Sequence, residues 1–331
     1  MTQAGAPPSV TVIVCTRDRR EELEVCLEAL AGQTCAVFQT LVVDNGASPG
    51  VADLCLRWGA RYVRESEPGL CFARNTGVRH ADSELVAFID DDAVPDGAWL
   101  ATLTTAFADP STAAATGTIT YVSTAHGARG ITAADVTPAS VRRLPEVFDR
   151  RSNGWFAQAC FGGIGDGSNM AFRRQALLES PGFDNRLGRG RVLDGGDESV
   201  VFMTLLALGH RIAHVPDAVI RHPAPADPQA LRARLFRERR NAVAYVLFLW
   251  TDFPANRRDL TRHLLGAAVR RLWWRCAPVQ GAGRLSVWRS LHAALAGVSL
   301  FAKARREWTT IPAPDYRGIG LPAHRRKEMT A

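Results

Sequence analysis

The chain has 331 residues, of which 47% are hydrophobic and 22% are charged. This length can bury a large core, which excludes a short disulfide-stapled fold, and the composition excludes global disorder and a fibrous repeat. No apolar run reaches the roughly 18 residues that a membrane-spanning helix requires. The amino terminus lacks the features of a secretory signal. We therefore expect a globular cytoplasmic protein whose residues 1–8 form a flexible tail.

The net charge of +7 hides a strong asymmetry along the chain. Residues 1–228 carry −7, whereas residues 229–331 carry +14 and five of the eight tryptophans. Positive charge combined with aromatic side chains is typical of segments that rest on anionic membranes. The alternative is that the apolar residues of this region pack on the rest of the protein while its arginines are merely solvated.

An apolar strand followed by an amphipathic helix recurs from residue 10 onward. Short β-branched runs that alternate with helices indicate a parallel sheet covered on both faces, in which ligands bind at the carboxyl ends of the strands. We expect the functional residues directly after the strands. The predicted strands are 10–15, 40–44, 60–64 and 85–90, and the predicted helices are 20–31, 49–58, one from 69 and 97–108.

The remainder of the chain is less regular. A strand is expected at 113–122, whereas 123–161 loses periodicity and is predicted to be an insertion or loop. Beyond residue 227 the pattern is helical, with a basic amphipathic helix near 260–276. Seven cysteines without a CxxC pair give no sign of a disulfide framework or a zinc site.

Three consecutive aspartates end the apolar strand at 85–90, in the sequence FIDDDAVP. Like charges this close repel each other unless a positive partner lies between them. Carboxylates suit Mg²⁺ or Mn²⁺, and such an ion with open positions commonly binds a diphosphate. Helix capping by Asp92 or Asp96 is the alternative, but it explains only one of the three.

Five blocks of residues 9–223 together resemble the family 2 glycosyltransferases, inverting enzymes of the GT-A fold that use nucleotide-diphosphate sugars. The resemblance implies an α/β fold with a Rossmann-like, mostly parallel sheet flanked by helices, here with a helical carboxy-terminal extension. The catalytic domain would span 9–228, with a nucleotide-binding half at 9–122 and an acceptor-binding half at 123–228, followed by a basic helical region at 229–331. The blocks are VTVIVCTRDR with LVVDNGAS, GLCFARNTGV, FIDDDAVP, GSNMAFRRQAL and GGDESVVFMTLLALGHRIAHVPDAVIRHP.

The same resemblance assigns the donor side of the site. Asp44 would accept the N3 hydrogen of a uracil or thymine ring, which suits a carboxylate at a strand end. Arg74 would offset the charge of the diphosphate, although an ion pair with an aspartate of FIDDDAVP is the alternative. The remaining assignments place Thr16 and Arg17 in the nucleotide pocket, Asp90 at the ribose, Asp91 in the nucleotide-sugar site without a defined role, and Asp92 at the metal.

The block GGDESVVF resembles the segment that supplies the catalytic base, but its acidic pair is reversed. Glu198 stands where the family has the aspartate that acts as base, and Asp197 stands where it has glutamate. Direct displacement at an anomeric carbon needs a carboxylate to take the proton of the acceptor hydroxyl. We therefore favour Glu198 and keep Asp197 as the alternative. Either residue would also suit the start of a helix.

His222 ends the VIRHP block, where part of the family has a metal-coordinating histidine. An imidazole beside two carboxylates would favour Mn²⁺ over Mg²⁺. A structural role for this histidine is the alternative.

The resemblance implies a hydroxyl acceptor, either a lipid-linked glycan or a small molecule, in polysaccharide, glycolipid or natural-product glycoside biosynthesis. We expect the enzyme in the cytoplasm, peripheral at the inner face of the membrane, and no nucleic-acid partner. A metal-dependent phosphatase or nucleotidyltransferase would not account for Asp44 or Glu198. A non-catalytic sugar-binding protein of the same fold would require damaged site positions.

Overall fold

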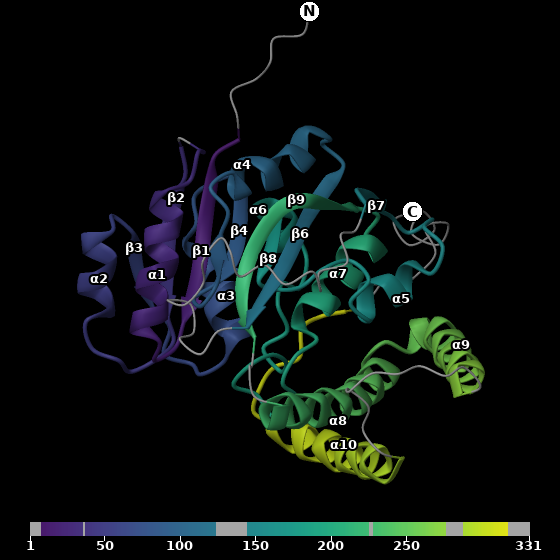
Figure 1. Ribbon diagram of the computed structural model, residues 1–331. Coiled ribbons are helices and arrows are strands. Elements are labelled where there is room, and N and C mark those ends of the chain that lie inside the picture. The colour runs from purple at the N-terminus through teal and green to yellow at the C-terminus, as the bar shows by residue number, and fades with distance from the viewer. Residues whose placement is uncertain (1–7, 36, 124–143, 225–227, 276–286, 317–331) are drawn as a thin grey trace, which may run out of the picture.

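The computed structural model of the protein describes residues 8–35, 37–123, 144–224, 228–275 and 287–316 (Figure 1). Its strands are β1 (Val10–Thr16), β2 (Gln39–Asp44), β3 (Arg61–Arg64), β4 (Leu85–Asp90), β5 (Val94–Pro95), β6 (Thr112–Ser123), β7 (Glu146–Phe148), β8 (Asn169–Arg173) and β9 (Arg211–Ala224). Its α-helices are α1 (Arg20–Ala31), α2 (Val51–Arg57), α3 (Leu70–His80), α4 (Trp99–Thr104), α5 (Trp155–Cys160), α6 (Arg174–Glu179), α7 (Asp197–Ala207), α8 (Pro228–Asp252), α9 (Arg257–Arg275) and α10 (Val287–Glu307).

The strands form one mixed sheet in the order β3-β2-β1-β4-β8-β6-β9-β5, with β7 paired to β9. The first four strands are parallel, as predicted from the repeated strand and helix pattern. β8 departs from this direction, because it runs antiparallel to both β4 and β6. The result is the α/β fold with a helical carboxy-terminal segment that the sequence predicts.

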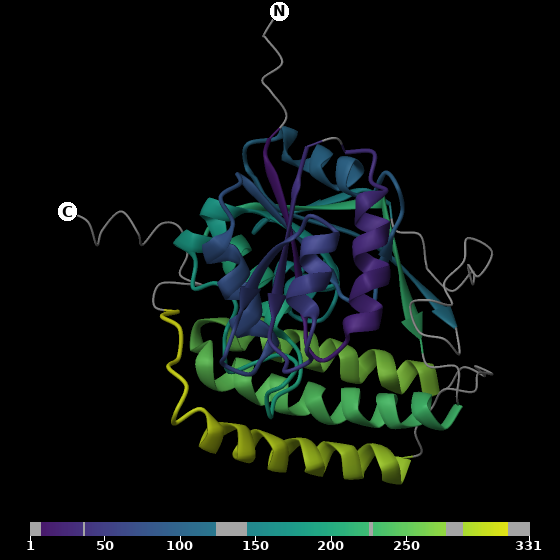
Figure 2. The same ribbon diagram turned by 90° about the vertical axis from the view of Figure 1, so that its left-hand side faces the viewer.

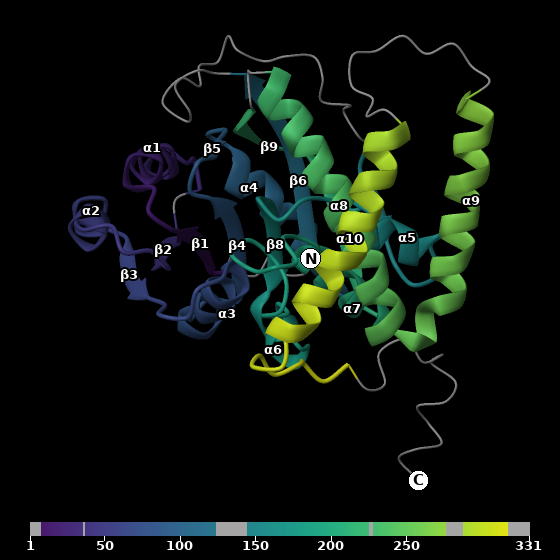
Figure 3. The ribbon, with the colours of Figure 1, turned by 90° about the horizontal axis from the view of Figure 1, so that it is seen from below.

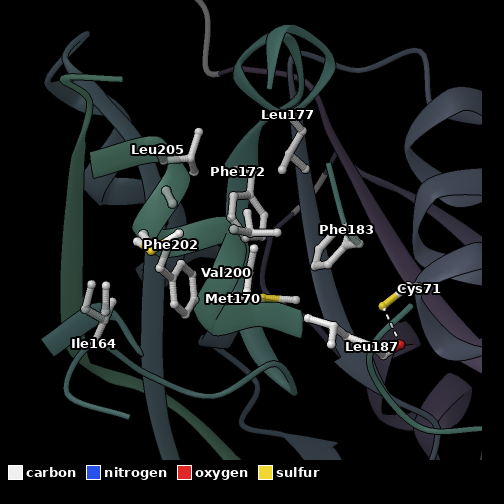
Figure 4. Packing of buried hydrophobic residues seen from close by; sticks show 14 of the residues in the cluster. Cys71, Ile164, Met170, Phe172, Leu177, Phe183, Leu187, Val200, Phe202 and Leu205 are labelled. Carbon is white, nitrogen blue, oxygen red and sulfur yellow. Dashed lines mark hydrogen bonds between the residues drawn. The ribbon is translucent and has the colours of Figure 1, made fainter. Parts of the chain in front are cut away.

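The sheet is buried on both faces, which is why its strands are continuous apolar runs. Ile13 of β1 belongs to one core cluster, and its neighbours Val12 and Val14 belong to the other. Figure 4 shows the first cluster, where Phe172 of β8 stacks near Phe202 of α7 with ring centroids 6.1 Å apart. Bulky side chains from strands and helices thus hold α7 against the sheet.

The segment predicted to be a loop is partly regular. β7 and α5 lie between residues 146 and 160, although residues 124–143 lie outside the described part of the chain. A strand of three residues and a helix of six are too short to show a hydrophobic period, so the sequence pattern missed them.

The carboxy-terminal helices lie across one end of the α/β portion, with α10 outermost (Figures 2 and 3). Phe248 of α8 and Leu260 of α9 are buried in the same cluster as Phe172. Within the described residues, no helix combines the length and the apolarity needed to span a bilayer. The predicted boundary at residue 228 stays a prediction.

The amphipathic helix predicted near 260–276 corresponds to α9, but its apolar residues are covered unevenly. Leu260 is buried, whereas Leu264 is 38% exposed and Leu265 is 63% exposed. The side chains of Trp273 and Trp274, which the sequence singled out, lie outside the described part of the chain.

Candidate active site

Three neighbouring strands deliver polar side chains to one edge of the sheet. Thr16 ends β1, Asp44 ends β2 and Asp90 ends β4. The parallel register places Thr16 beside Asp44, and Cys15 beside Asp90. In Figure 1, β1 runs from the top of the view, where the amino terminus lies, down toward α8. Its carboxyl end, and with it this edge of the sheet, therefore faces the helical layer. The residues predicted to follow the strands therefore meet at the carboxyl edge.

Asp90, Asp92 and His222 meet at this edge, although His222 comes from β9 on the other side of the sheet. Nε2 of His222 lies 3.1 Å from Oδ1 of Asp92 and 3.5 Å from Oδ2 of Asp90. One potential ligand atom from each residue can be chosen such that all three lie within 4.8 Å of one another. Two carboxylate oxygens and an imidazole nitrogen match the preferences of Mn²⁺, and less closely those of Mg²⁺.

Charges at this cluster compensate one another. Burial disfavours the protonated form of His222, but Asp90 and Asp92 outweigh it and raise the pKa of His222 to about 10. Burial also opposes ionisation of Asp92, yet His222 and Arg19 lower the pKa of Asp92 to about 2. The cluster thus holds ionised carboxylates and a cationic imidazole, an arrangement in which a divalent cation can replace the positive charges.

Two details fit a bound metal ion. Oδ1 of Asp92 is buried and forms no aligned hydrogen bond within the described residues, despite its ion-pair contact with His222. Nδ1 of His222 lies 3.0 Å from the carbonyl oxygen of Pro223. A proton on Nδ1 leaves Nε2 as the ligand atom when the ring is neutral, which is the usual tautomer of a metal-binding histidine.

Asp91 does not belong to this cluster of three potential metal ligands. Its Oδ2 accepts a 2.8 Å hydrogen bond from the hydroxyl of Thr16. Burial and the neighbouring charge of Asp92 raise the pKa of Asp91 to about 7, against the lowering effect of Thr16. The structure thereby brings Thr16 and Asp91 together at the end of β1, so that Asp91 orients the Thr16 hydroxyl.

Arg19 is a participant that the sequence analysis missed. Its Nη1 lies 2.5 Å from Oδ2 of Asp92 and 3.4 Å from Oδ1 of Asp91. The side chain is 40% exposed, so solvent weakens this ion pair and the guanidinium can leave. The arginine-rich run TRDRR contained the signal, but spacing alone does not tell which of its arginines turns toward the aspartates.

Arg74 joins the aspartate cluster to the segment expected to hold the catalytic base. Its Nη1 lies 2.5 Å from Oδ2 of Asp197, and its Nη2 lies 4.0 Å from Asp90 and 2.9 Å from the carbonyl oxygen of Gly167. A Cβ on Gly167 would lie only 2.7 Å from Nη2. The small residue lets the guanidinium reach both carboxylates.

Asp197 and Glu198 open α7, but their environments differ. Asp197 is buried and neutralised by Arg74. The half-buried side chain of Glu198 forms no ion pair with any residue that the structure describes, and the hydrogen bond that acts on its carboxyl group comes from its own backbone. Burial and the like charges of Asp197 and Asp166 raise the pKa of Glu198 well above its ordinary value, although Arg74 counteracts them.

The carboxy-terminal region supports this segment directly. Gly196, which precedes Asp197, has φ +83°, and a Cβ there would lie 2.5 Å from the ring of Tyr245 in α8. Glycine satisfies both the left-handed backbone and the close approach. α8 thus braces the start of α7, a contact that no local sequence pattern indicates.

Asp44 lies in a separate part of the carboxyl edge. Its Oδ1 accepts a 2.9 Å hydrogen bond from the backbone of Gly46, and its Oδ2 accepts bonds from the hydroxyl of Tyr62 at 3.1 Å and Nη1 of Arg64 at 2.9 Å. Neither Tyr62 nor Arg64 was predicted from the sequence as a contact of Asp44. Arg17 is exposed at the mouth of the same edge, with Nη1 beside Gly190.

The sequence profile of Glycosyl transferase family 2 matches residues 11–179, which is more than half of the chain. The chain therefore belongs to this family and is a glycosyltransferase. Membership removes the phosphatase and nucleotidyltransferase alternative.

Several curated relatives are similar to this chain. A glucosyl-dolichyl phosphate glucuronosyltransferase of Haloferax volcanii is 24% identical over 64% of this chain and 68% of its own length. An N-acetylglucosaminyltransferase of Sinorhizobium fredii is 26% identical over 87% of this chain and 70% of its own length. The glycosyltransferase AglE of Haloferax volcanii is 31% identical, but the match covers 28% of this chain and only a third, 33%, of that relative.

Solved structures show the same fold. A Pyrobaculum calidifontis mannosyltransferase in complex with GDP-Man and Mn²⁺ has a TM-score of 0.53 and 23% identity, covering 92% of this chain and 84% of the other. S. aureus TarS in complex with UDP has a TM-score of 0.50 and 11% identity, covering 97% and 78%. At these identities the likeness concerns the architecture alone.

Proposed function

We propose that this glycosyltransferase moves a sugar from a UDP- or dTDP-linked donor to a hydroxyl group, with inversion at the anomeric carbon and Glu198 as the general base. The contrast between the two carboxyl groups at the start of α7 carries the proposal. Asp197 is held by Arg74, whereas Glu198 has no such partner in the described structure and its pKa is raised toward the range of a useful base. Asp197 then positions Arg74 and does not accept the proton.

The aspartate cluster would hold the divalent metal, Mn²⁺ or Mg²⁺, through Asp90, Asp92 and His222. When bound, such an ion supplies positive charge to the leaving diphosphate. Because the guanidinium of Arg74 lies 4.0 Å from Asp90, Arg74 would add a second positive charge beside the leaving diphosphate. Arg19 would release Asp92 to the ion and gain the freedom to contact phosphate.

The preference for uracil or thymine follows from the acceptor positions of Asp44. A carboxylate has about four lone-pair positions. Gly46, Tyr62 and Arg64 occupy three, so one remains on Oδ1 for a single N–H group. The N3–H of uracil or thymine meets this requirement, whereas N3 of cytosine is an acceptor and would face the carboxylate lone pairs. Thr16 and Arg17 would line the same pocket.

We propose a lipid-linked glycan as the acceptor, ahead of a soluble small molecule. The glucuronosyltransferase of Haloferax volcanii that is similar to this chain carries glucosyl-dolichyl phosphate in its name. In addition, the carboxyl edge of the sheet faces the basic helical layer. Such an acceptor would place the enzyme at the cytoplasmic face of the membrane as a peripheral protein.

Donor hydrolysis tests this function without knowledge of the acceptor. The full-length protein is incubated with a panel of UDP-, dTDP-, GDP- and CDP-sugars, with Mn²⁺, Mg²⁺ or a chelator, and nucleotide release is measured. We expect slow metal-dependent release from one UDP- or dTDP-sugar. Release from a CDP-sugar alone would contradict the role of Asp44, and release unaffected by the chelator would contradict the metal site.

A further inference from the structure

Helix α10 has two faces with different surroundings. Ala293, Gly297 and Ala304 are buried, and a Cβ on Gly297 would lie 2.6 Å from the carbonyl oxygen of Arg240 and 2.7 Å from Cβ of Val243 in α8. These small residues let α10 lie close along α8. The packing of α10 on the protein is therefore achieved by one side of the helix.

The opposite side carries four large apolar residues that we call the outer stripe. Trp288 is 80% exposed, Leu291 51%, Leu295 64% and Val298 52%. Steps of three, four and three residues put them on one helical face. Their exposure shows that no other element of the described chain covers this face, and α10 is the outermost helix of the layer in Figure 2.

Cations accompany the outer stripe. Lys303, Arg305 and Arg306 are exposed near the end of α10. Glu307 is the single acidic residue in the sequence of α10, and it lies 3.6 Å from Arg191 of the α/β portion, at the ion-pair distance. The outward surface of this helix is thus apolar and positively charged, with no acidic group of its own free to oppose an anionic partner.

We propose that the outer stripe of α10 is the face with which this protein docks on an anionic lipid bilayer. The competing occupant is a second copy of the chain. In a parallel twofold contact along the stripe, Lys303, Arg305 and Arg306 would lie beside their own copies and repel them. In an antiparallel contact they would face the beginning of the partner helix, which carries no acidic residue, because the single one, Glu307, lies at the other end and pairs with Arg191, so neither arrangement supplies an opposite charge. Anionic headgroups supply the opposite charge, and the boundary region of a bilayer accepts tryptophan and leucine.

The position of α10 connects this surface to the active site. α8 contacts α10 on one side and, through Tyr245, touches Gly196 at the start of α7 on the other. Two helix diameters amount to roughly 20 Å. A docked enzyme would therefore hold Glu198 near the membrane surface, which suits the headgroup of a lipid-linked acceptor. This last step rests on the proposed function, whereas docking does not.

Vesicle sedimentation tests the proposal with the full-length protein. The vesicles contain either phosphatidylcholine alone or phosphatidylcholine with phosphatidylglycerol, at low and high salt. We expect binding to the anionic vesicles that weakens with salt. Leu291→Gln with Leu295→Gln should lower the partition constant at least tenfold, because two exposed leucines lose their apolar contact with lipid. Replacing Lys303, Arg305 and Arg306 by glutamine should cost about fivefold per charge on anionic vesicles.

Matched controls separate docking from other causes. Leu56 is 82% exposed on α2, a helix that covers the sheet near its β3 edge and is not part of the helical layer, so Leu56→Gln should bind like the unaltered protein. Circular dichroism should show unchanged melting for all variants, since every substituted side chain is exposed. The proposal is wrong if the unaltered protein stays in the supernatant at low salt, or if the double leucine variant binds normally. A dimer that the leucine substitutions dissociate, without vesicle binding, would identify a second copy as the occupant.

Donor hydrolysis is measured on the same variants. It should be unchanged in all of them, because the outer stripe does not contact the site. Vesicle binding without any metal-dependent hydrolysis in the unaltered protein would contradict the proposed function and leave the docking surface intact.

Discussion

The α/β region and the carboxy-terminal helical layer use their cations in opposite ways. At the carboxyl edge of the sheet, Arg19, Arg64 and Arg74 are each paired with an aspartate. In the helical layer, Lys303, Arg305 and Arg306 face outward. The two parts carry −7 and +14. Charge in the first region organises the interior of a site, whereas these three cations at the end of α10 are available to an external partner.

The largest expected effect comes from removing a carboxylate of the aspartate cluster at the sheet edge. Asp92→Ala should abolish transfer and the metal-dependent part of nucleotide affinity, because Asp92 contacts both His222 and Arg19 and offers a buried, unbonded oxygen. Calorimetry of UDP binding with and without Mn²⁺ measures this. Metal-dependent affinity that survives the substitution would remove Asp92 from the metal site.

Separate substitutions of the two carboxyl groups at the start of α7 distinguish their roles. Glu198→Gln should keep donor affinity and lower kcat by about two to four orders of magnitude, the usual contribution of a general base. Asp197→Asn should instead destabilise the protein, by up to about 3–5 kcal/mol, since the buried Arg74 loses its short ion pair and keeps only the longer ion pair with Asp90. Steady-state kinetics and thermal unfolding distinguish the two. A stable Asp197→Asn enzyme without activity, next to an active Glu198→Gln enzyme, would reverse the roles.

The pH dependence of turnover follows from the same carboxyl group. A general base works only when ionised, so kcat should rise with pH through the pKa of Glu198. Burial and the charges of Asp197 and Asp166 raise that pKa, which moves the acidic limb well above the ordinary range of a glutamate. The pH profile of kcat at saturating donor measures the limb. A limb at the ordinary glutamate pKa would show that burial and the neighbouring carboxylates do not raise the pKa of Glu198.

Nucleotide selectivity tests the pairing of Asp44 with a single imide hydrogen. UDP and dTDP should bind about 10- to 100-fold more tightly than CDP, since a lost hydrogen bond at a buried carboxylate costs about 1–3 kcal/mol. Competition titration with the three nucleotides at fixed Mn²⁺ gives the ratios. The Asp44→Asn variant should bind UDP and CDP with similar affinity, and equal affinities in the unaltered protein would show that Asp44 does not contact the base.

The smallest effect concerns Arg19, the least buried of the cations at the metal cluster. Arg19→Ala should raise the affinity for Mn²⁺ in the absence of nucleotide by about tenfold, because the guanidinium competes for Oδ2 of Asp92. It should also weaken metal-dependent UDP binding. Titration followed by the paramagnetic resonance signal of free Mn²⁺ measures the first effect. The control is Arg57→Ala, which removes an exposed ion pair between Arg57 of α2 and Glu24 of α1.

Much of the fold was predictable because periodicity is a local property. The first four strands and the helices between them follow from runs of apolar residues, and the parallel arrangement places Thr16, Asp44 and Asp90 at one edge. The short elements β7 and α5 escaped notice because three and six residues do not complete a pattern. The antiparallel direction of β8 was also invisible, since strand direction is set by pairing and not by composition.

The kinds of groups present can be read from the order of residues: an aspartate cluster, a reversed acidic pair and a basic carboxy-terminal third. Their partners depend on how the chain folds. Asp197 meets Arg74 across 123 positions of sequence, and Asp92 meets Arg19 across 73. In the same way, the packing of α10 on α8 decides that Leu291 and Leu295 face outward while Ala293 and Gly297 face inward. Electrostatic and apolar contacts act over a few ångströms of space, and distance along the chain carries almost no information about them.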